Sequence, residues 1–264
     1  MTSTILHLSD GLAAHALITG QGIPLVLLHG VGLCAEAWGP QFEELGPDHH
    51  VIAVDLPGHG ASDALPGAPM LGDFVGWAAR VIDALGCGPV SVAGHSMGAL
   101  IATGLAIEHP DLITRVALLN PVYRRSAAAR AAVQDRAAQI AAANFDPEAP
   151  LERWFGSDQA ALRAQTSAWL LQNTPEGYGA VYRAFAAGDS VYADRIAEIR
   201  CSFLALTGAE DLNSTAEMAR ALAQAAPLGR AIVIEEHRHM VHLTAPEQVS
   251  KALRDWLSPA AVSS

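Results

Sequence analysis

A serine held between two glycines is the residue of this chain whose surroundings best suit covalent chemistry. The segment Gly94 to Gly98 has the pattern G-x-S-x-G, directly after the apolar run 89–93 and directly before an apolar, alanine-rich run over 99–102. This order predicts a strand, a sharp turn and a helix, with Ser96 at the apex of the turn. Larger residues than glycine would collide with the strand or the helix. The serine hydroxyl would project where free helix N–H groups favour negative charge.

Serine alone is a weak nucleophile, so a base and a carboxylate that orients the base must come from elsewhere in the chain. Asp211 follows the apolar run 203–207, at the predicted C-terminal end of a strand, where a carboxylate can point into a site; Glu210 is its nearest rival. Histidines that could act as the base follow the last predicted strand, at His237, His239 and His242. The residue types and their spacing leave these alternatives open.

The elements that must position these residues follow an alternating pattern. Short apolar runs bounded by Gly or Pro alternate with longer helical patterns, which is typical of an α/β fold with a mostly parallel sheet and helices on both faces. The runs predicted as strands are 24–29, 50–54, 90–93, 113–119, 203–207 and 231–234, after an N-terminal hairpin over 5–18. The segments predicted as helices are 70–85, 97–109, 216–226 and 246–257.

The alternation stops near Pro121 and resumes near Cys201. The segment between them is helical in character, with an alanine-rich stretch over 127–143 and breaks at 146–147 and 174–177. We therefore expect two parts, an α/β core formed by residues 1–121 and 193–264 and an inserted helical cap, or lid, formed by residues 122–192. An insertion after the sixth strand would lie over the carboxyl ends of the strands, where α/β folds bind ligands.

Three features together resemble the α/β-hydrolase family, in its serine hydrolase branch, over almost the full length of the chain. They are the G-x-S-x-G turn, the order Ser, Asp, His, and the segment Leu28-His29-Gly30-Val31-Gly32. In that family the base usually lies in a Gly-His pair seven residues before a Pro-Glu pair. His239 stands seven residues before Pro246-Glu247, with Arg238 in place of the glycine. The resemblance implies that His239 is the base, with His242 as the alternative.

The resemblance also implies how these residues would work. Ser96 attacks a carbonyl carbon, His239 takes the serine proton and later activates water, and Asp211 orients and stabilises the histidine. The backbone N–H groups of Val31 and Met97 hold the oxyanion.

Other polar residues near these motifs are expected to have structural roles. Asn120 occupies a position that carries the acid in some relatives, but a neutral amide cannot stabilise an imidazolium, which favours the aspartate. Asp55 and His59 lie in a segment that resembles the family's loop after the fourth strand and are expected to hold turns, as is His29. Cys34 is expected to be a small packing residue.

The resemblance narrows the expected reaction. Dehalogenases and epoxide hydrolases use aspartate where this chain has Ser96, and residues 173–185 resemble the lid of 3-oxoadipate enol-lactonases. We expect hydrolysis of an ester or lactone of a small, carboxylated substrate through an acyl-enzyme intermediate. One alternative is a C–C bond hydrolase of ring-cleavage products, although those relatives often carry glycine at the position of Ala99. A second alternative is a non-catalytic protein that keeps the pocket as a receptor.

Charge indicates where an anionic substrate would approach. Residues 123–192 contain seven arginines and seven acidic residues, so the whole net charge of −11 belongs to the rest of the chain. An anion would meet less repulsion at this neutral segment than elsewhere. The residues that we expect to contact substrate are Arg124, Arg125, Arg183, Trp38, Trp154 and Tyr182.

Composition excludes several other classes of protein. A net charge of −11 with a single lysine disfavours nucleic acids and anionic membrane surfaces as partners, and no apolar stretch is long enough for a membrane span. The N-terminus has no basic start typical of a signal peptide, and three widely spaced cysteines fit a reducing compartment, so we expect a cytoplasmic protein. No spacing indicates a metal site and no cofactor is implied. The expected partner is a small-molecule substrate, bound by a monomer or a homo-oligomer.

Overall fold

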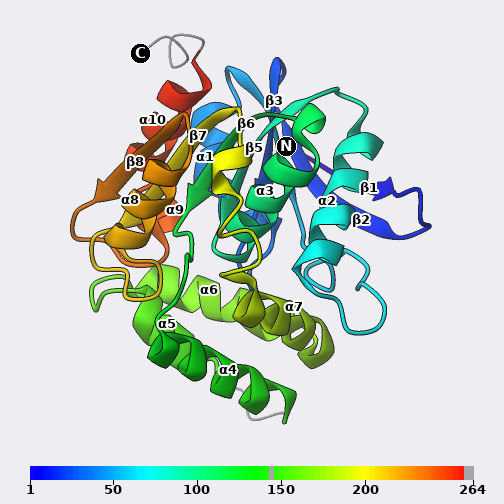
Figure 1. Cartoon of the computed structure of the whole chain (residues 1–264). Helices are drawn as coiled ribbons and strands as arrows, with labels where there is room; N and C mark the ends of the chain where they lie inside the picture. Colours follow the sequence, from blue (N-terminus) through cyan, green and yellow to red (C-terminus); the bar gives the residue numbers. More distant parts are fainter. Residues whose placement is uncertain (143–145, 259–264) are drawn as a thin grey trace.

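An eight-stranded sheet forms the centre of the molecule. The computed structural model describes residues 1–142 and 146–258 (Figure 1). Strand β2 is antiparallel to both of its neighbours and all other neighbouring pairs are parallel, in the order β1-β2-β4-β3-β5-β6-β7-β8. The strands are β1 (Thr2–His7), β2 (Ala13–Thr19), β3 (Ile23–Leu28), β4 (His49–Val54), β5 (Val90–His95), β6 (Ile113–Leu119), β7 (Ser202–Gly208) and β8 (Gly229–Ile234). The predicted α/β class, the hairpin and the mostly parallel sheet are confirmed.

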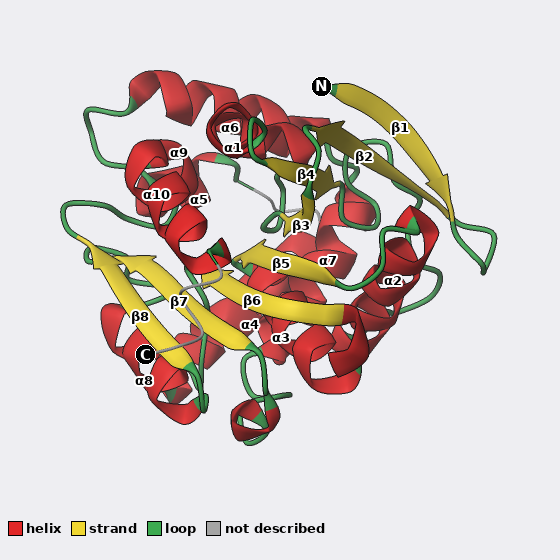
Figure 2. Cartoon of the chain, turned by 90° about the horizontal axis from the view of Figure 1, so that it is seen from above, coloured by secondary structure: helices red, strands yellow, loops and turns green. Residues whose placement is uncertain are grey.

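Helices cover both faces of the sheet, because each face presents a continuous apolar surface (Figure 2). One face carries α1 (Gly39–Leu45), α9 (Val241–Thr244) and α10 (Pro246–Leu257); the other carries α2 (Leu71–Leu85), α3 (Met97–Glu108) and α8 (Ala216–Ala225). Single turns η1 (Ala35–Trp38), η2 (Pro110–Leu112) and η3 (Ile196–Glu198) lie between these elements. No helix in the described part of the chain has both the length and the apolar character needed to cross a membrane.

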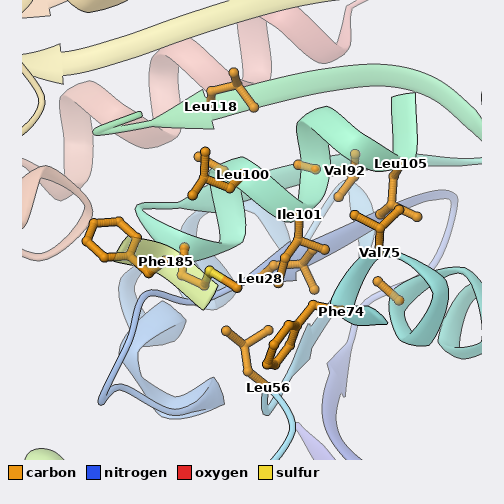
Figure 3. Packing of buried hydrophobic residues seen from close by; sticks show 14 of the residues in the cluster. Leu28, Leu56, Phe74, Val75, Val92, Leu100, Ile101, Leu105, Leu118 and Phe185 are labelled. Carbon is orange, nitrogen blue, oxygen red and sulfur yellow. The ribbon is translucent and has the colours of Figure 1, made fainter. Parts of the chain in front are cut away.

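Four helices between β6 and β7 form a separate layer at one end of the sheet (Figure 1). They are α4 (Ala127–Ala141), α5 (Glu148–Trp154), α6 (Ala160–Gln172) and α7 (Pro175–Gly188). Helix α7 attaches this layer to the core, because Phe185 belongs to the same apolar cluster as Leu100 and Ile101 of α3 (Figure 3). We call this layer the cap; the division at residues 122 and 192 stays a prediction. Residues 143–145, and residues 259–264 of the predicted core, lie outside the described residues.

The turn between β5 and α3 is held in strained backbone geometry. Ser96 has φ 54° and ψ −107°, a backbone conformation that residues other than glycine rarely adopt. A Cβ atom on Gly94 would overlap the backbone of Gly98, and one on Gly98 would overlap the carbonyl of Leu28 at the end of β3. Both glycines are therefore required because strand and helix backbones pass within contact distance of each other.

Gly98→Ala is expected to lower the free energy of unfolding by about 3 kcal/mol or more, because the added methyl group cannot avoid the Leu28 carbonyl unless β3 or α3 moves. Gly72→Ala is the matched control, since a methyl group on Gly72 in the first turn of α2 meets nothing within 4 Å. Alanine is favoured over glycine in helices by about 0.5–1 kcal/mol, so the control should be at least as stable as the wild type. Urea unfolding measures both, and equal stability of the two variants would contradict the prediction.

Candidate active site

Three side chains from distant parts of the chain form a hydrogen-bonded line at the carboxyl ends of the strands. Ser96 follows β5, Asp211 follows β7 and His239 follows β8. The Ser96 Oγ lies 3.1 Å from Nε2 of His239, and Nδ1 of His239 lies 2.7 Å from Oδ2 of Asp211. All three side chains are buried, with Ser96 only 5% exposed. This arrangement allows the imidazole to take a proton from the hydroxyl while the carboxylate stabilises the resulting positive charge.

The carboxylate of Asp211 remains ionised although it is buried. Its Oδ1 accepts hydrogen bonds from the backbone N–H groups of Asn213 (2.8 Å) and Ser214 (3.1 Å), and its Oδ2 accepts from Nδ2 of Asn120 (2.8 Å) as well as from His239. Burial alone would raise the pKa of Asp211, but the charge and hydrogen bond of His239 and the other donors lower it below its ordinary value. Asn120 therefore acts as a donor to the carboxylate.

The rival residues lie elsewhere. Glu210 is exposed, and its carboxylate lies 3.7 Å from Nε of Arg238. His237 pairs with the hydroxyl of Thr244 at 2.9 Å. His242 is fully buried against Trp38, with a ring separation of 4.9 Å, and neither of its ring nitrogens has a hydrogen-bond partner among the described residues. The geometry thus brings Asp211 and His239 to Ser96 and leaves the alternatives outside the line.

Two backbone N–H groups beside the serine are unused. Neither Val31 nor Met97 donates a backbone hydrogen bond within residues 1–142 and 146–258, whereas the neighbouring N–H of Gly32 donates to Nε2 of His59 at 2.9 Å. Met97 is the first residue of α3, where a helix leaves its N–H groups without partners. These two donors are available to an oxygen that develops negative charge next to Ser96.

Buried histidines hold the loops around this site. His29 accepts a hydrogen bond from the N–H of Leu56 (2.9 Å) and donates to the carbonyl of Gly30 (2.7 Å). His95 donates from Nε2 to the carbonyl of His239 at 2.8 Å. Burial lowers the pKa of His29 to about 4, and burial together with the neighbouring His29 lowers that of His59 to about 3. These imidazoles are therefore neutral and serve as fixed donors and acceptors.

Two more expected structural roles are visible in the contacts. Asp55 accepts hydrogen bonds from the N–H groups of Ala35 (2.7 Å) and Ala61 (3.0 Å) and pairs with His15 (2.7 Å). Cys34 is buried in the apolar core, and burial raises the pKa of its thiol. Both residues thus stabilise the loop after β3.

A cavity of about 280 Å³ opens between these residues and the cap. Its floor includes Ser96 and His239 together with Gly30 and Val31. Cap residues that line it include Arg125, Arg136, Arg153, Trp154, Tyr178 and Tyr182. Trp154 stacks near the base, with its ring 6.0 Å from the ring of His239 at an angle of 25°. Three of the residues expected to contact substrate, Trp154, Tyr182 and Arg125, therefore line the cavity.

Three of the residues expected to contact substrate lie outside the cavity lining. Trp38 has no exposed surface and packs under the sheet with α1 and α10, because its apolar ring belongs to the second core cluster. Arg124 pairs with Asp194 in solvent, away from the cavity lining. Arg183 is exposed and is absent from the lining, because it is one residue from Tyr182 and so points to a different side of α7.

Arg136, Arg153 and Tyr178 line the cavity, although the sequence analysis did not predict that they contact substrate. A signal was present for Arg136, which lies three residues after Val133 and four before Ile140. This spacing places the arginine on the apolar face of an alanine-rich helix, toward the cavity. No group of three or more His, Cys, Asp and Glu residues in the described segments could hold a metal ion.

Comparison with known proteins agrees with this geometry. A family model described as "Alpha/beta hydrolase family" matches residues 25–252. The chain belongs to the alpha/beta hydrolase family. It is 51% identical to (E)-2-((N-methylformamido)methylene)succinate hydrolase from Acinetobacter baylyi, over 97% of this chain and 98% of the relative. The resemblance to this family is thus confirmed, and the protein is a hydrolase of this fold.

Solved alpha/beta hydrolases have closely similar folds. A thermophilic esterase from Thermogutta terrifontis, solved with malate bound, has a TM-score of 0.87 and 25% identity, covering 97% of this chain and 98% of the esterase. The enol-lactonase from Burkholderia xenovorans LB400 has a TM-score of 0.88 and 26% identity, covering 96% of this chain and 99% of the lactonase. The enol-lactonase expected from the lid sequence is therefore among the structural neighbours.

Asp211→Asn is expected to lower kcat by about 10⁴-fold, the size of the loss for the equivalent change in Ser-His-Asp proteases, since an amide neither fixes the histidine tautomer nor stabilises its charge. Glu210→Gln is the matched control, and its kcat should stay within about 3-fold of wild type because its side chain lies outside the line. Steady-state kinetics with p-nitrophenyl acetate measures both. A larger loss for Glu210→Gln than for Asp211→Asn would reverse the assignment of the acid.

The buried histidines predict a loss of stability in weak acid. The unfolded chain protonates each imidazole near its ordinary pKa of 6.5, whereas burial lowers the folded pKa to about 4 for His29 and to about 3 for His59 and His242. The unfolded state therefore binds more protons between these values, and the free energy of unfolding falls as pH falls from about 6.5 towards 4. The expected slope is up to about 1.4 kcal/mol per pH unit for each group.

Urea unfolding at pH 7.5, 6.5, 5.5 and 5.0 measures this slope. His242→Phe removes one of the titrating groups and should make the pH dependence shallower than in the wild type. A wild-type free energy of unfolding that is constant from pH 7.5 to 5.0 would show that the buried imidazoles do not control acid stability.

Proposed function

We propose that the protein is a serine hydrolase that cleaves an acyl bond of a small, carboxylated substrate through an acyl-enzyme intermediate. The observation that carries the proposal is the line from Asp211 through His239 to Ser96, with contacts of 2.7 and 3.1 Å, which opens into the cavity under the cap. Each residue is in contact with the next, so the proposal requires no rearrangement of the loops.

In the first half of the reaction, the Ser96 Oγ–H gives its proton to Nε2 of His239 as the oxygen bonds to the carbonyl carbon. The carbonyl oxygen becomes an oxyanion, which the N–H groups of Val31 and Met97 hold. Each such donor is typically worth on the order of 3–4 kcal/mol in the transition state. When the tetrahedral intermediate collapses, the leaving group takes the proton from His239 and the acyl group remains on Ser96.

In the second half, water replaces the leaving group. His239 accepts a proton from the water, the hydroxide oxygen bonds to the acyl carbon, and the second tetrahedral intermediate is held by the same two N–H groups. Its collapse breaks the bond to Oγ, and the proton on His239 returns to Ser96. The products are a carboxylic acid and the released alcohol, amine or ring-opened chain.

The relatives indicate which bonds deserve testing. The Acinetobacter baylyi relative is named for a succinate that carries an N-methylformamido group, which contains an N-formyl amide bond. The Burkholderia neighbour is an enol-lactonase and the Thermogutta neighbour an esterase. Esters and lactones of small carboxylic acids are thus our first candidates, and the 51% identity favours an N-formyl bond as the second.

A fluorescent alkyl fluorophosphonate at pH 7.5 should label the wild type on Ser96, because only an activated serine reacts with such a reagent. Ser96→Ala should not be labelled. His239→Ala should be labelled at least about 100-fold more slowly, since general-base assistance is worth roughly 10²–10⁴-fold. Mass spectrometry of the labelled peptide identifies the site. A folded wild type that is not labelled would favour the non-catalytic receptor instead.

A substrate panel then separates the remaining reactions. It contains esters, lactones, an N-formyl enamide and a ring-cleavage dienone, all assayed with the wild type and Ser96→Ala. Turnover of the dienone alone would favour the C–C bond hydrolase.

A further inference from the structure

The cap wall of the cavity carries more positive charge than the structure itself neutralises. Three arginines line the cavity, Arg125, Arg136 and Arg153, against a single acidic residue, Asp146. Asp146 is exposed and accepts a hydrogen bond from the N–H of Glu148 at 2.9 Å, so its carboxylate is held at the start of α5. The lining therefore has a net charge of +2 in a protein whose overall charge is −11.

Arg125 is fixed in the wall by its neighbours. Its Nη1 donates to Asp189 (3.2 Å) and to the carbonyl of Phe185 (3.3 Å), and its guanidinium lies 4.5 Å from the centre of the Phe185 ring. Asp189 also pairs with Arg130 at 2.9 Å, so one carboxylate serves two cations. Arg125 is only 6% exposed, and its Nη2 has no hydrogen-bond partner among the described residues. Arg125 therefore contributes a buried positive charge, and its Nη2 group can still donate a hydrogen bond to a ligand.

Arg136 and Arg153 project into the same cavity from two different helices, α4 and α5. Neither forms an ion pair or a hydrogen bond with another described residue, and Nε of Arg153 is buried without a partner. Burial and the nearby charge of Arg136 lower the pKa of Arg153, so the two guanidinium groups repel each other. Like charges in a partly buried wall are unfavourable unless an anion lies between them.

We propose that Arg136 and Arg153, backed by Arg125, form a subsite that binds two carboxylate groups of the substrate, so that the preferred substrates are small dicarboxylates. Guanidinium groups bind carboxylates through paired N–H donors, and two free arginines match two carboxylates. Tyr182 lines the same wall and can add a neutral hydroxyl donor. The proposal rests on the proposed function, because the same cavity must hold the reacting acyl group over Ser96.

Kinetics with three esters tests the charge preference. p-Nitrophenyl acetate has no carboxylate, p-nitrophenyl hemisuccinate has one and O-acetylmalate has two. Arg136→Gln and Arg153→Gln should each lower kcat/KM for O-acetylmalate by about 10- to 100-fold, since each loses a charge-assisted contact. The fold-loss in kcat/KM for p-nitrophenyl acetate should be at least about 10-fold smaller, because that ester has no carboxylate. Arg183 is an exposed cap arginine outside the lining, so Arg183→Gln is the matched control. It should leave kcat/KM for all three esters within about 3-fold of the wild type. Equal losses for the neutral and the doubly charged ester would overturn the subsite.

A binding measurement separates this proposal from the proposed function. In the Ser96→Ala background, calorimetry should detect succinate binding at least about 10-fold more tightly than butyrate, which has the same length and one carboxylate fewer. Adding Arg136→Gln or Arg153→Gln should abolish that difference, with thermal unfolding used to show that each variant is folded. Arginine-dependent succinate binding, together with a wild type that the fluorophosphonate fails to label, would retain the subsite and reject the hydrolase. A labelled serine with equal affinity for succinate and butyrate would retain the hydrolase and reject the subsite.

Discussion

A buried, ionised carboxylate organises the candidate active site. Such a group is stable away from water only when its oxygens accept enough hydrogen bonds. The four donors to Asp211 are the N–H groups of Asn213 and Ser214, the amide of Asn120 and the imidazole of His239. Asn120 follows β6, Asp211 follows β7 and His239 follows β8, so this single requirement joins the carboxyl ends of three neighbouring strands. The imidazole that donates to the carboxylate is thereby turned toward Ser96, which follows β5 on the other side of β6.

The two histidines packed beside that imidazole are uncharged. His95 and His242 lie behind it, and burial together with the neighbouring histidines lowers the pKa of each. A positive charge at either ring would compete with His239 for Asp211, and it would act strongly because the interior screens charges weakly. His95 instead donates a neutral hydrogen bond to the carbonyl of His239, which holds the loop in place. Of these three histidines, His239 is therefore the one whose ring can take up a positive charge next to Ser96.

Local patterns predicted the core well, because each strand has an apolar run and the turn at Ser96 needs its glycines. They predicted Asp211 and His239 only with help from the family resemblance, since three histidines share one loop and a sequence does not show which ring turns toward the serine. Side-chain direction is what these patterns do not show. Trp38 follows the loop that contains Val31, yet its ring packs in the core with residues of α1 and α10. Arg136 reaches the cavity because it lies on the apolar face of α4, a pattern that counting charges along the cap does not detect.

Arg238, which replaces the usual glycine, connects the cap to the base. Its Nη1 donates to the carbonyls of Glu152 (3.1 Å) and Phe155 (2.8 Å) at the end of α5, where a helix favours a cation. Its own carbonyl accepts from Asn120, the amide that also supports Asp211. Trp154, between the two bonded carbonyls, stacks near His239. Helix α5 also carries Arg153, so the hydrogen bonds of Arg238 fix the position of the arginine wall relative to the nucleophile. A glycine at this position would remove these two hydrogen bonds between α5 and the loop of His239.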